Sequence, residues 1–265
     1  MSESPHSGFN GPHGQSFGIV GTDKSAESPD TLTSDMGPIL LDDCVASLLA
    51  AASGADQEAL GQTVDRMLTN QVTMDMIVDR CFPEVARALG AAWSDDSMAF
   101  STVTIGCSRL EAKLHDLDPS HEKEGDRKSC VLLLVPQNET HTLGARILAL
   151  QMRRRQTSVR VLIGEALDDV ARILAESRFD GVFLSAAHGN EFKSLRDLTI
   201  LIRTMGKVPP LVILGGAILK DVRFDRPTLL RLTGADYACD DPDEALRLCG
   251  IVEAPRAIKQ RARGN

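Results

Sequence analysis

The sequence lacks several features that would place the protein in a common class. None of its six cysteines forms a Cys-x-x-Cys pair, so neither a disulfide framework nor a thiolate metal site is indicated. No apolar run approaches the ~20 residues needed to span a bilayer, and no signal-peptide pattern opens the chain. The formal net charge of -8 argues against a general coat for nucleic acid. We therefore expect a cytosolic protein without a membrane-spanning segment, and direct contact with DNA is left open.

The composition changes along the 265 residues and divides the chain into segments. Gly, Ser, Pro, Asp and Thr dominate the first segment, whereas the second has apolar residues at helical spacing in four stretches. Thr73 and Ser101 are predicted to cap the third and fourth of these helices. We expect a disordered arm at 1–38, a four-helix cap domain at 39–117, a linker at 118–129, an α/β domain at 130–252 and a basic tail at 253–265.

From residue 130 onward, short apolar runs alternate with amphipathic stretches. Five consecutive aliphatic residues, 131–135, are typical of a strand buried on both faces. Further strands are predicted at 159–163, 182–185, 211–214 and 237–238, with helices at 144–155, 167–177, 192–205, 228–232 and 243–249. The fold class is therefore α/β, with a helical bundle followed by a Rossmann-like (flavodoxin-like) sheet of five parallel strands. The basic residues 153–155 close the first of these helices and are interpreted as a solvated cap that complements the helix dipole.

Polar and small residues follow the first, third and fourth predicted strands. Glu139 and His141 lie in the first of these loops, where the carboxylate can orient one ring nitrogen while the other binds a metal. Ser185 ends the third strand, and a Gly-Gly pair at 215–216 ends the fourth. Open α/β sheets place their ligands at the carboxyl ends of strands, so these residues are expected to converge on one crevice. Taken singly, a solvated loop histidine and a simple Gly-Gly turn remain open alternatives.

The order and spacing of these elements resemble the cobalamin-binding domain family. The family pattern is an Asp-x-His-x-x-Gly loop, a Ser-x-Leu element and a Gly-Gly pair. The corresponding elements here are Glu139-x-His141-x-x-Gly144, Ser185-x-Ala187 and Gly215-Gly216. Glu therefore replaces Asp, which keeps the acceptor on a longer arm, and Ala replaces Leu, which loosens the packing around the cofactor tail.

This resemblance implies a role for each residue. His141 would displace the dimethylbenzimidazole base and become the lower cobalt ligand, with Glu139 as its acceptor. Gly144 would let the loop turn into the helix without a Cβ in the way. Further cofactor contacts are expected from Thr140, Thr142, Gly164, Ser185, Ala187, His188, Gly215 and Gly216. Hydroxo-, methyl- and adenosylcobalamin all remain possible cofactors, and haem bound through His141 is the alternative.

The helical half contains the only tryptophan, Trp93, which is predicted to lie in the connection between the third and fourth helices. Such an indole is often a lid on the bundle core. A bundle ahead of this domain also resembles the cap of corrinoid proteins, where Trp93, Val103 and Thr104 would flank the upper cobalt face. Cobalamin photoreceptors have Glu-His where this chain has Val103-Thr104. With the tryptophan retained and the histidine missing, the chain is similar to the antirepressor branch of purple photosynthetic bacteria, the AerR/PpaA proteins.

The resemblance implies a non-enzymatic function. We expect a cobalamin-binding, light-responsive transcriptional regulator that acts as an antirepressor by binding a PpsR/CrtJ-type repressor of photosynthesis genes. A corrinoid carrier subunit of a methyltransferase system is the first alternative, because it shares the fold and the cofactor. A haem-binding redox or light sensor is the second.

Overall fold

The structure is a computed structural model that describes residues 38–118, 129–189, 192–205 and 208–251. The predicted arm, linker and basic tail lie outside the described residues except at their edges, where Pro38, Asp118 and Ser129 are described. Within the described part of the chain, no helix combines the length and the apolar character needed to cross a lipid bilayer.

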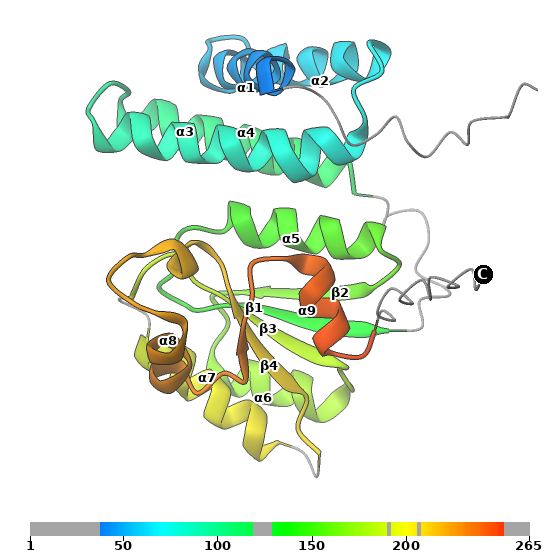
Figure 1. Cartoon of the computed structure of the whole chain (residues 1–265), viewed down its shortest axis with the longest axis vertical. Helices are drawn as coiled ribbons and strands as arrows, with labels where there is room; N and C mark the ends of the chain where they lie inside the picture. The colour runs from blue at the N-terminus through cyan, green and yellow to red at the C-terminus, as the bar shows by residue number, and fades with distance from the viewer. Residues whose placement is uncertain (1–37, 119–128, 190–191, 206–207, 252–265) are drawn as a thin grey trace, which may run out of the picture. The chain divides into compact units, whose positions relative to one another are not determined.

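The first half of the described chain is a bundle of helices, as predicted. It contains α1 (Pro38–Ser53), α2 (Ala59–Thr69), α3 (Phe82–Ser94) and α4 (Phe100–Asp116), and a π-helical turn, Met76–Cys81, runs directly into α3 (Figure 1). The predicted cap at Thr73 is confirmed, because its hydroxyl accepts from the Met76 amide at 3.2 Å. The predicted cap at Ser101 is wrong: α4 begins at Phe100 after the extended residue Ala99, so Ser101 lies inside the helix.

The core of the bundle extends into the second half of the chain. Its fully buried side chains recur at helical spacing and include Leu48, Ile77, Phe82, Leu89 and Leu110. Leu143, Ile147 and Leu150 of α5 (Leu143–Arg154) belong to the same apolar cluster. The bundle therefore packs on α5, which lies between the bundle and the sheet in Figure 1.

The second half is the predicted five-stranded parallel sheet. Its strands are β1 (Cys130–Val135), β2 (Ser158–Ile163), β3 (Gly181–Ser185), β4 (Leu211–Gly215) and β5 (Tyr237–Ala238), in the order β2-β1-β3-β4-β5. All four pairings are parallel. β3 is buried along its whole length and β1 along all but its first residue, which explains their uninterrupted apolar sequences. The predicted fold class is confirmed.

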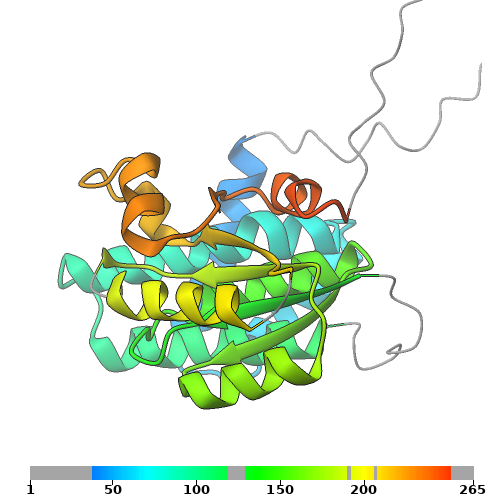
Figure 2. The ribbon, with the colours of Figure 1, turned by 90° about the horizontal axis from the view of Figure 1, so that it is seen from below.

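Helices cover both faces of the sheet (Figures 1 and 2). α5 and α9 (Pro242–Leu248) pack on the face formed by Val131, Leu133 and Val135 of β1. The opposite face carries α6 (Leu167–Glu176), α7 (Phe192–Thr204) and α8 (Arg226–Thr233). Side chains alternate between the two faces along a strand. The face of each residue near a strand end therefore follows from the face of the residue two positions before it.

The three arginines at the end of α5 are not a solvated cap, so that interpretation is wrong. Arg153 pairs with Asp118, and Arg155 binds Asp243 of α9 through Nε at 2.5 Å and Nη2 at 2.9 Å. Arg154 Nη2 lies 2.6 Å from Asp75 Oδ1 and 2.9 Å from Asp79 Oδ2. The Arg154 and Asp79 side chains are 15% and 23% exposed. The last turn of α5 therefore carries ion pairs to α9 and to the bundle.

Arg154→Ala should lower the free energy of unfolding by roughly 2 to 3 kcal/mol, because it leaves the half-buried Asp79 carboxylate without its cation. Urea unfolding of the purified protein measures this change. Arg172→Ala is the matched control, since Arg172 is 57% exposed and pairs with Asp169 and Glu176 of its own helix. The control should change stability by less than about 0.5 kcal/mol. Equal effects of the two substitutions would show that the ion pairs of Arg154 with Asp75 and Asp79 do not stabilise the fold.

Candidate cofactor site

The loop from β1 to α5 is organised around a buried carboxylate. Glu139 is 7% exposed. Its Oε1 accepts from the His141 amide at 2.7 Å and lies 2.7 Å from Nδ1 of the His141 ring. Its Oε2 accepts from the amide of Ala187, in the loop after β3, at 2.8 Å. One side chain therefore fixes the loop, the imidazole and the neighbouring loop.

These contacts decide the charge of Glu139. Burial by itself would raise the pKa of Glu139, but the hydrogen bonds from the Ala187 amide and from the His141 amide and ring outweigh it. The pKa of Glu139 is consequently held below its ordinary value. A carboxylate beside Nδ1 favours the ring form that carries its proton on Nδ1. This leaves Nε2 of His141 as the nitrogen with a free lone pair for a metal.

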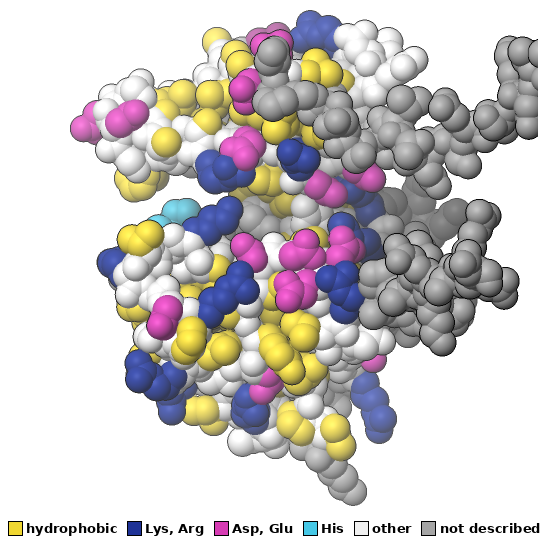
Figure 3. Space-filling view, in the orientation of Figure 1, with side chains coloured by type: hydrophobic (Ala, Val, Ile, Leu, Met, Phe, Trp, Pro, Cys, Tyr) yellow, Lys and Arg dark blue, Asp and Glu magenta, His cyan; other side chains and the backbone are white. Residues whose placement is uncertain are grey.

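Two histidines meet at this site. The His141 side chain is 52% exposed even though its acceptor is buried. The ring of His188 stands edge-on to it, with ring centroids 4.7 Å apart. The structure therefore brings His188 to the predicted site. Figure 3 shows histidine side chains reaching the surface of the sheet domain next to basic side chains.

The ends of β3 and β4 lie side by side. Ser185 is paired in register with Gly215, and both lie on the α5–α9 face by alternation with Phe183 and Ile213. Gly216 has φ +99°, and a Cβ there would come within 2.3 Å of the Ala186 carbonyl oxygen. The second glycine is thus required by the close approach of two backbones, whereas a Cβ on Gly215 would meet the Cys239 carbonyl oxygen at 3.3 Å.

Gly144 does not have the predicted conformational role. It lies in the first turn of α5, which begins one residue earlier, at Leu143, and its φ is not positive. The reason given for it, a turn into the helix, is therefore wrong. A Cβ at Gly144 would meet no other atom within 4 Å, so the helix surface is open there. Gly164 does need its glycine, because it has φ +71° beside Gln137 of the β1 loop.

The bundle residues divide into two groups. Trp93 lies in the last turn of α3 and not in the connection, so its predicted position is wrong. Its side chain is 49% exposed and contacts Phe100, which is 66% exposed, with ring centroids 5.8 Å apart. Thr104 is exposed and donates to the Phe100 carbonyl at 2.9 Å. Val103 is only 9% exposed and packs in the bundle core, so it does not reach the surface on which Thr104 lies. The predicted cofactor contact of Val103 is therefore wrong.

Two functional contacts were not foreseen from the sequence. The backbone amide of Ala187, rather than its side chain, is what the site uses. Glu111 of α4 accepts from the Thr142 hydroxyl at 2.5 Å and lies 3.4 Å from Arg146 Nε. The neighbouring Thr140 is exposed in the loop. No local pattern in the sequence points to either contact, because each joins residues far apart in the chain.

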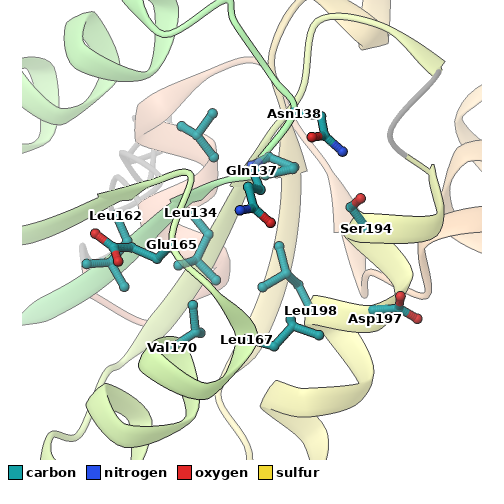
Figure 4. Close-up of a pocket in the computed structure, with 12 residues that line it drawn as sticks. Leu134, Gln137, Asn138, Leu162, Glu165, Leu167, Val170, Ser194, Asp197 and Leu198 are labelled. Carbon is teal, nitrogen blue, oxygen red and sulfur yellow. The ribbon is translucent and has the colours of Figure 1, made fainter.

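A cavity of about 130 Å³ lies beside the site (Figure 4). Leucine side chains and Val170 form its apolar part, and Gln137, Asn138, Glu165, Ser194 and Asp197 supply polar groups. Leu134, Leu162 and Leu198 of its lining belong to the core on the α6–α7 side of the sheet. Ser185 and the Gly-Gly pair lie on or beyond the other face and do not line it. The cavity is therefore distinct from the predicted place of a cofactor tail.

Comparisons with known proteins bear on the family and the fold of the chain. No family model matches the sequence. The chain is 35% identical over 182 residues to an uncharacterized 20.5 kDa protein of the bchF-crtJ intergenic region of Rhodobacter capsulatus, covering 67% of this chain and 92% of that protein. The structure of the present chain is similar to that of the monomethylamine corrinoid protein of Methanosarcina barkeri, with TM-score 0.63 and 15% identity over 79% of this chain and 98% of that chain. A cobalamin-binding protein of Desulfitobacterium hafniense DCB-2 is less similar, with TM-score 0.41 and 17% identity over 79% and 98% of the two chains. The chain therefore has the fold of a corrinoid protein.

Glu139→Gln should disrupt the loop more than its similar shape suggests. Both carboxylate oxygens accept from N–H groups, so a glutamine would turn its own NH₂ group toward one of those donors. We expect the free energy of unfolding to fall by roughly 2 kcal/mol. Urea unfolding at neutral pH measures it, with Glu165→Gln, at an exposed position after β2, as the control.

The pH dependence gives a second readout of the same variant. Because the pKa of Glu139 is lower in the folded protein, its contribution to stability is complete at neutral pH and is lost as the pH falls through the folded-state pKa. The wild-type protein should show this acid component and Glu139→Gln should lack it. Wild-type stability in the variant at neutral pH would contradict the network.

Proposed function

The chain belongs to the family of the Rhodobacter capsulatus 20.5 kDa protein, and we propose that it is a cobalamin-binding regulator that is not an enzyme. One observation carries the cofactor proposal. A surface imidazole stands at the carboxyl end of the parallel sheet, with one ring nitrogen held by the buried Glu139 carboxylate and Nε2 left for a metal.

The residues present suit a cobalt corrinoid. The corrin ring would itself supply most of the ligands of the cobalt, so His141 alone would be enough as the protein ligand. The open surface at Gly144 leaves room beside the ring, and Ser185 with Gly215 offers a hydroxyl and bare backbone to the nucleotide tail. The exposed pair of Trp93 and Phe100 offers the bundle's apolar surface to the upper face. A bound methyl- or adenosylcobalamin would supply a cobalt–carbon bond that light or a methyl acceptor can break.

The regulatory part of the proposal draws on the relative. Its position between bchF and crtJ supports a role in controlling photosynthesis genes. The partner we propose is a repressor of the PpsR/CrtJ kind, which the protein would bind as an AerR/PpaA-like antirepressor in response to light. The cofactor would be hydroxo-, methyl- or adenosylcobalamin.

A corrinoid carrier of a methyltransferase system is the second candidate. It is favoured by the likeness of the fold to a monomethylamine corrinoid protein, and it uses the same His141 and the same sheet. A haem sensor would use His141 as well, and the absorption spectrum of the loaded protein separates the two macrocycles. Sensor and carrier differ in whether the state of the cofactor controls the binding of another protein.

His141→Ala should lower the affinity for hydroxocobalamin by roughly a hundredfold or more, because it removes the protein ligand and strands the Glu139 carboxylate. Titration followed by absorbance measures the affinity. His115→Ala, a histidine of α4 outside the proposed site, should bind as the wild type does. Wild-type affinity in His141→Ala would refute the site.

Illumination should change the affinity for the repressor. A ligand shifts a conformational equilibrium only by its difference in affinity for the two arrangements, so the apo, dark alkylcobalamin and illuminated proteins must bind the partner differently if the protein is a sensor. Isothermal titration of the three forms with a PpsR/CrtJ-type repressor measures this. Equal affinity in all three forms would put the carrier function first.

A further inference from the structure

The carboxylate of Glu111 holds the start of α5 against the bundle. Its Oε1 accepts from the Thr142 hydroxyl at 2.5 Å and lies 3.4 Å from Nε of Arg146, one turn further along α5. The Glu111 side chain is 28% exposed, so this contact is partly shielded from water. A hydrogen bond to a carboxylate is among the stronger ones in proteins, and shielding strengthens it further.

Thr142 departs from the usual behaviour of its position. It is the N-cap of α5, where a threonine hydroxyl ordinarily accepts a hydrogen bond from an amide of the first turn. Here the side chain makes no cap and donates to Glu111 instead. The Thr142 backbone is already helical, with φ −88° and ψ −22°, so its hydroxyl does not cap the first turn and bonds to another element instead.

The bond lies next to the candidate metal ligand. His141 precedes Thr142, and on its other side Glu139 binds the His141 amide and ring and the Ala187 amide. The loop is consequently fixed at two points. Glu139 fixes it to the loop after β3, and Glu111 fixes it to α4.

We propose that Glu111 is a positioning residue for His141 and that it acts through Thr142. Metal binding by His141 and the position of α4 then depend on each other. About two turns before Glu111, α4 carries Thr104, and both residues are accessible on the same side of the helix. A change in the loop therefore reaches the bundle surface through one helix. Coupling of this kind is reciprocal, so whatever moves α4 also changes how readily His141 accepts a metal. The metal part of this inference rests on the proposed function. The hydrogen bond between Thr142 and Glu111, here called the tether, is present in the protein without a cofactor.

The test uses removal and rescue at both ends of the bond. Glu111→Leu removes the acceptor and Glu111→Gln keeps a carbonyl oxygen, whereas Thr142→Val removes the donor and Thr142→Ser keeps it. Glu84→Leu is the control, since Glu84 is a bundle carboxylate that pairs with Arg87 on its own helix. All variants are made in the full chain.

The first readout is amide hydrogen exchange in the protein without cofactor. Exchange at residues 139–143 should become faster by roughly tenfold in Glu111→Leu and Thr142→Val, as expected for loss of a charged hydrogen bond. Glu111→Gln and Thr142→Ser should recover at least part of the protection, and Glu84→Leu should leave it unchanged. Unchanged exchange in both removal variants would overturn the tether.

The second readout is the affinity for hydroxocobalamin. Each removal variant should lose roughly tenfold in affinity, and the double variant should lose clearly less than the sum of the two single losses, because both substitutions break the same bond although Glu111→Leu also removes the contact with Arg146. Wild-type affinity in both single variants, or fully additive losses, would overturn positioning through Thr142. If His141→Ala also binds normally, the proposed cofactor site fails instead, and the exchange result on the cofactor-free protein still decides the tether.

Discussion

The buried Glu139 carboxylate is the constraint on which the site depends. A charge removed from water must be matched by donors, and here the amides of His141 and Ala187 and the imidazole ring provide them. This matching is possible because β1 and β3 are neighbours in the sheet, which brings the loops at their carboxyl ends together. The result is an imidazole whose orientation is set by buried groups although the ring itself is half exposed to solvent.

Helix α5 makes that loop part of both halves of the molecule. One side of the helix packs on the sheet through Ala145, Ala149 and Met152, and another belongs to the bundle core through Leu143, Ile147 and Leu150. Its first turn meets Glu111 and its last turn forms ion pairs with the bundle and α9. A helix that is packed from two sides responds to its surroundings as a unit, because close-packed interiors do not deform freely. The loop that carries His141 and the bundle are therefore both joined to α5.

The periodicity of apolar residues was sufficient to predict the sheet and the helices. The local patterns used to place helix ends gave two wrong positions. The strands were predicted within a residue of their ends. β1 and β3 are buried apolar runs, whereas the exposed Arg160 interrupts β2. Trp93 was placed in a connection because Ser and Asp follow it, yet the alanines before it extend α3 through Ser94. Ser101 looked like a cap because it precedes an apolar run, whereas the helix had already begun.

Contacts between distant residues could not be predicted from local pattern. The three consecutive arginines at 153–155 find partners in Asp75, Asp79, Asp118 and Asp243, which are spread across the chain. The acceptor role of Glu139 toward Ala187 likewise depends on strand order, which the spacing of a motif does not contain. The motif identified His141 and its acceptor, and only the fold reveals what holds them.

Electron paramagnetic resonance of the reduced, cobalt(II) form of the loaded protein tests the central claim most directly. An axial nitrogen splits the cobalt signal, and the splitting pattern depends on the isotope of that nitrogen. Protein made with histidine carrying the heavy nitrogen isotope should convert the axial triplet splitting into a doublet, because the ligand is a protein histidine, and His141→Ala should not show this doublet. An unchanged triplet would show that the cofactor's own base still binds the metal, and it would contradict this account of the site.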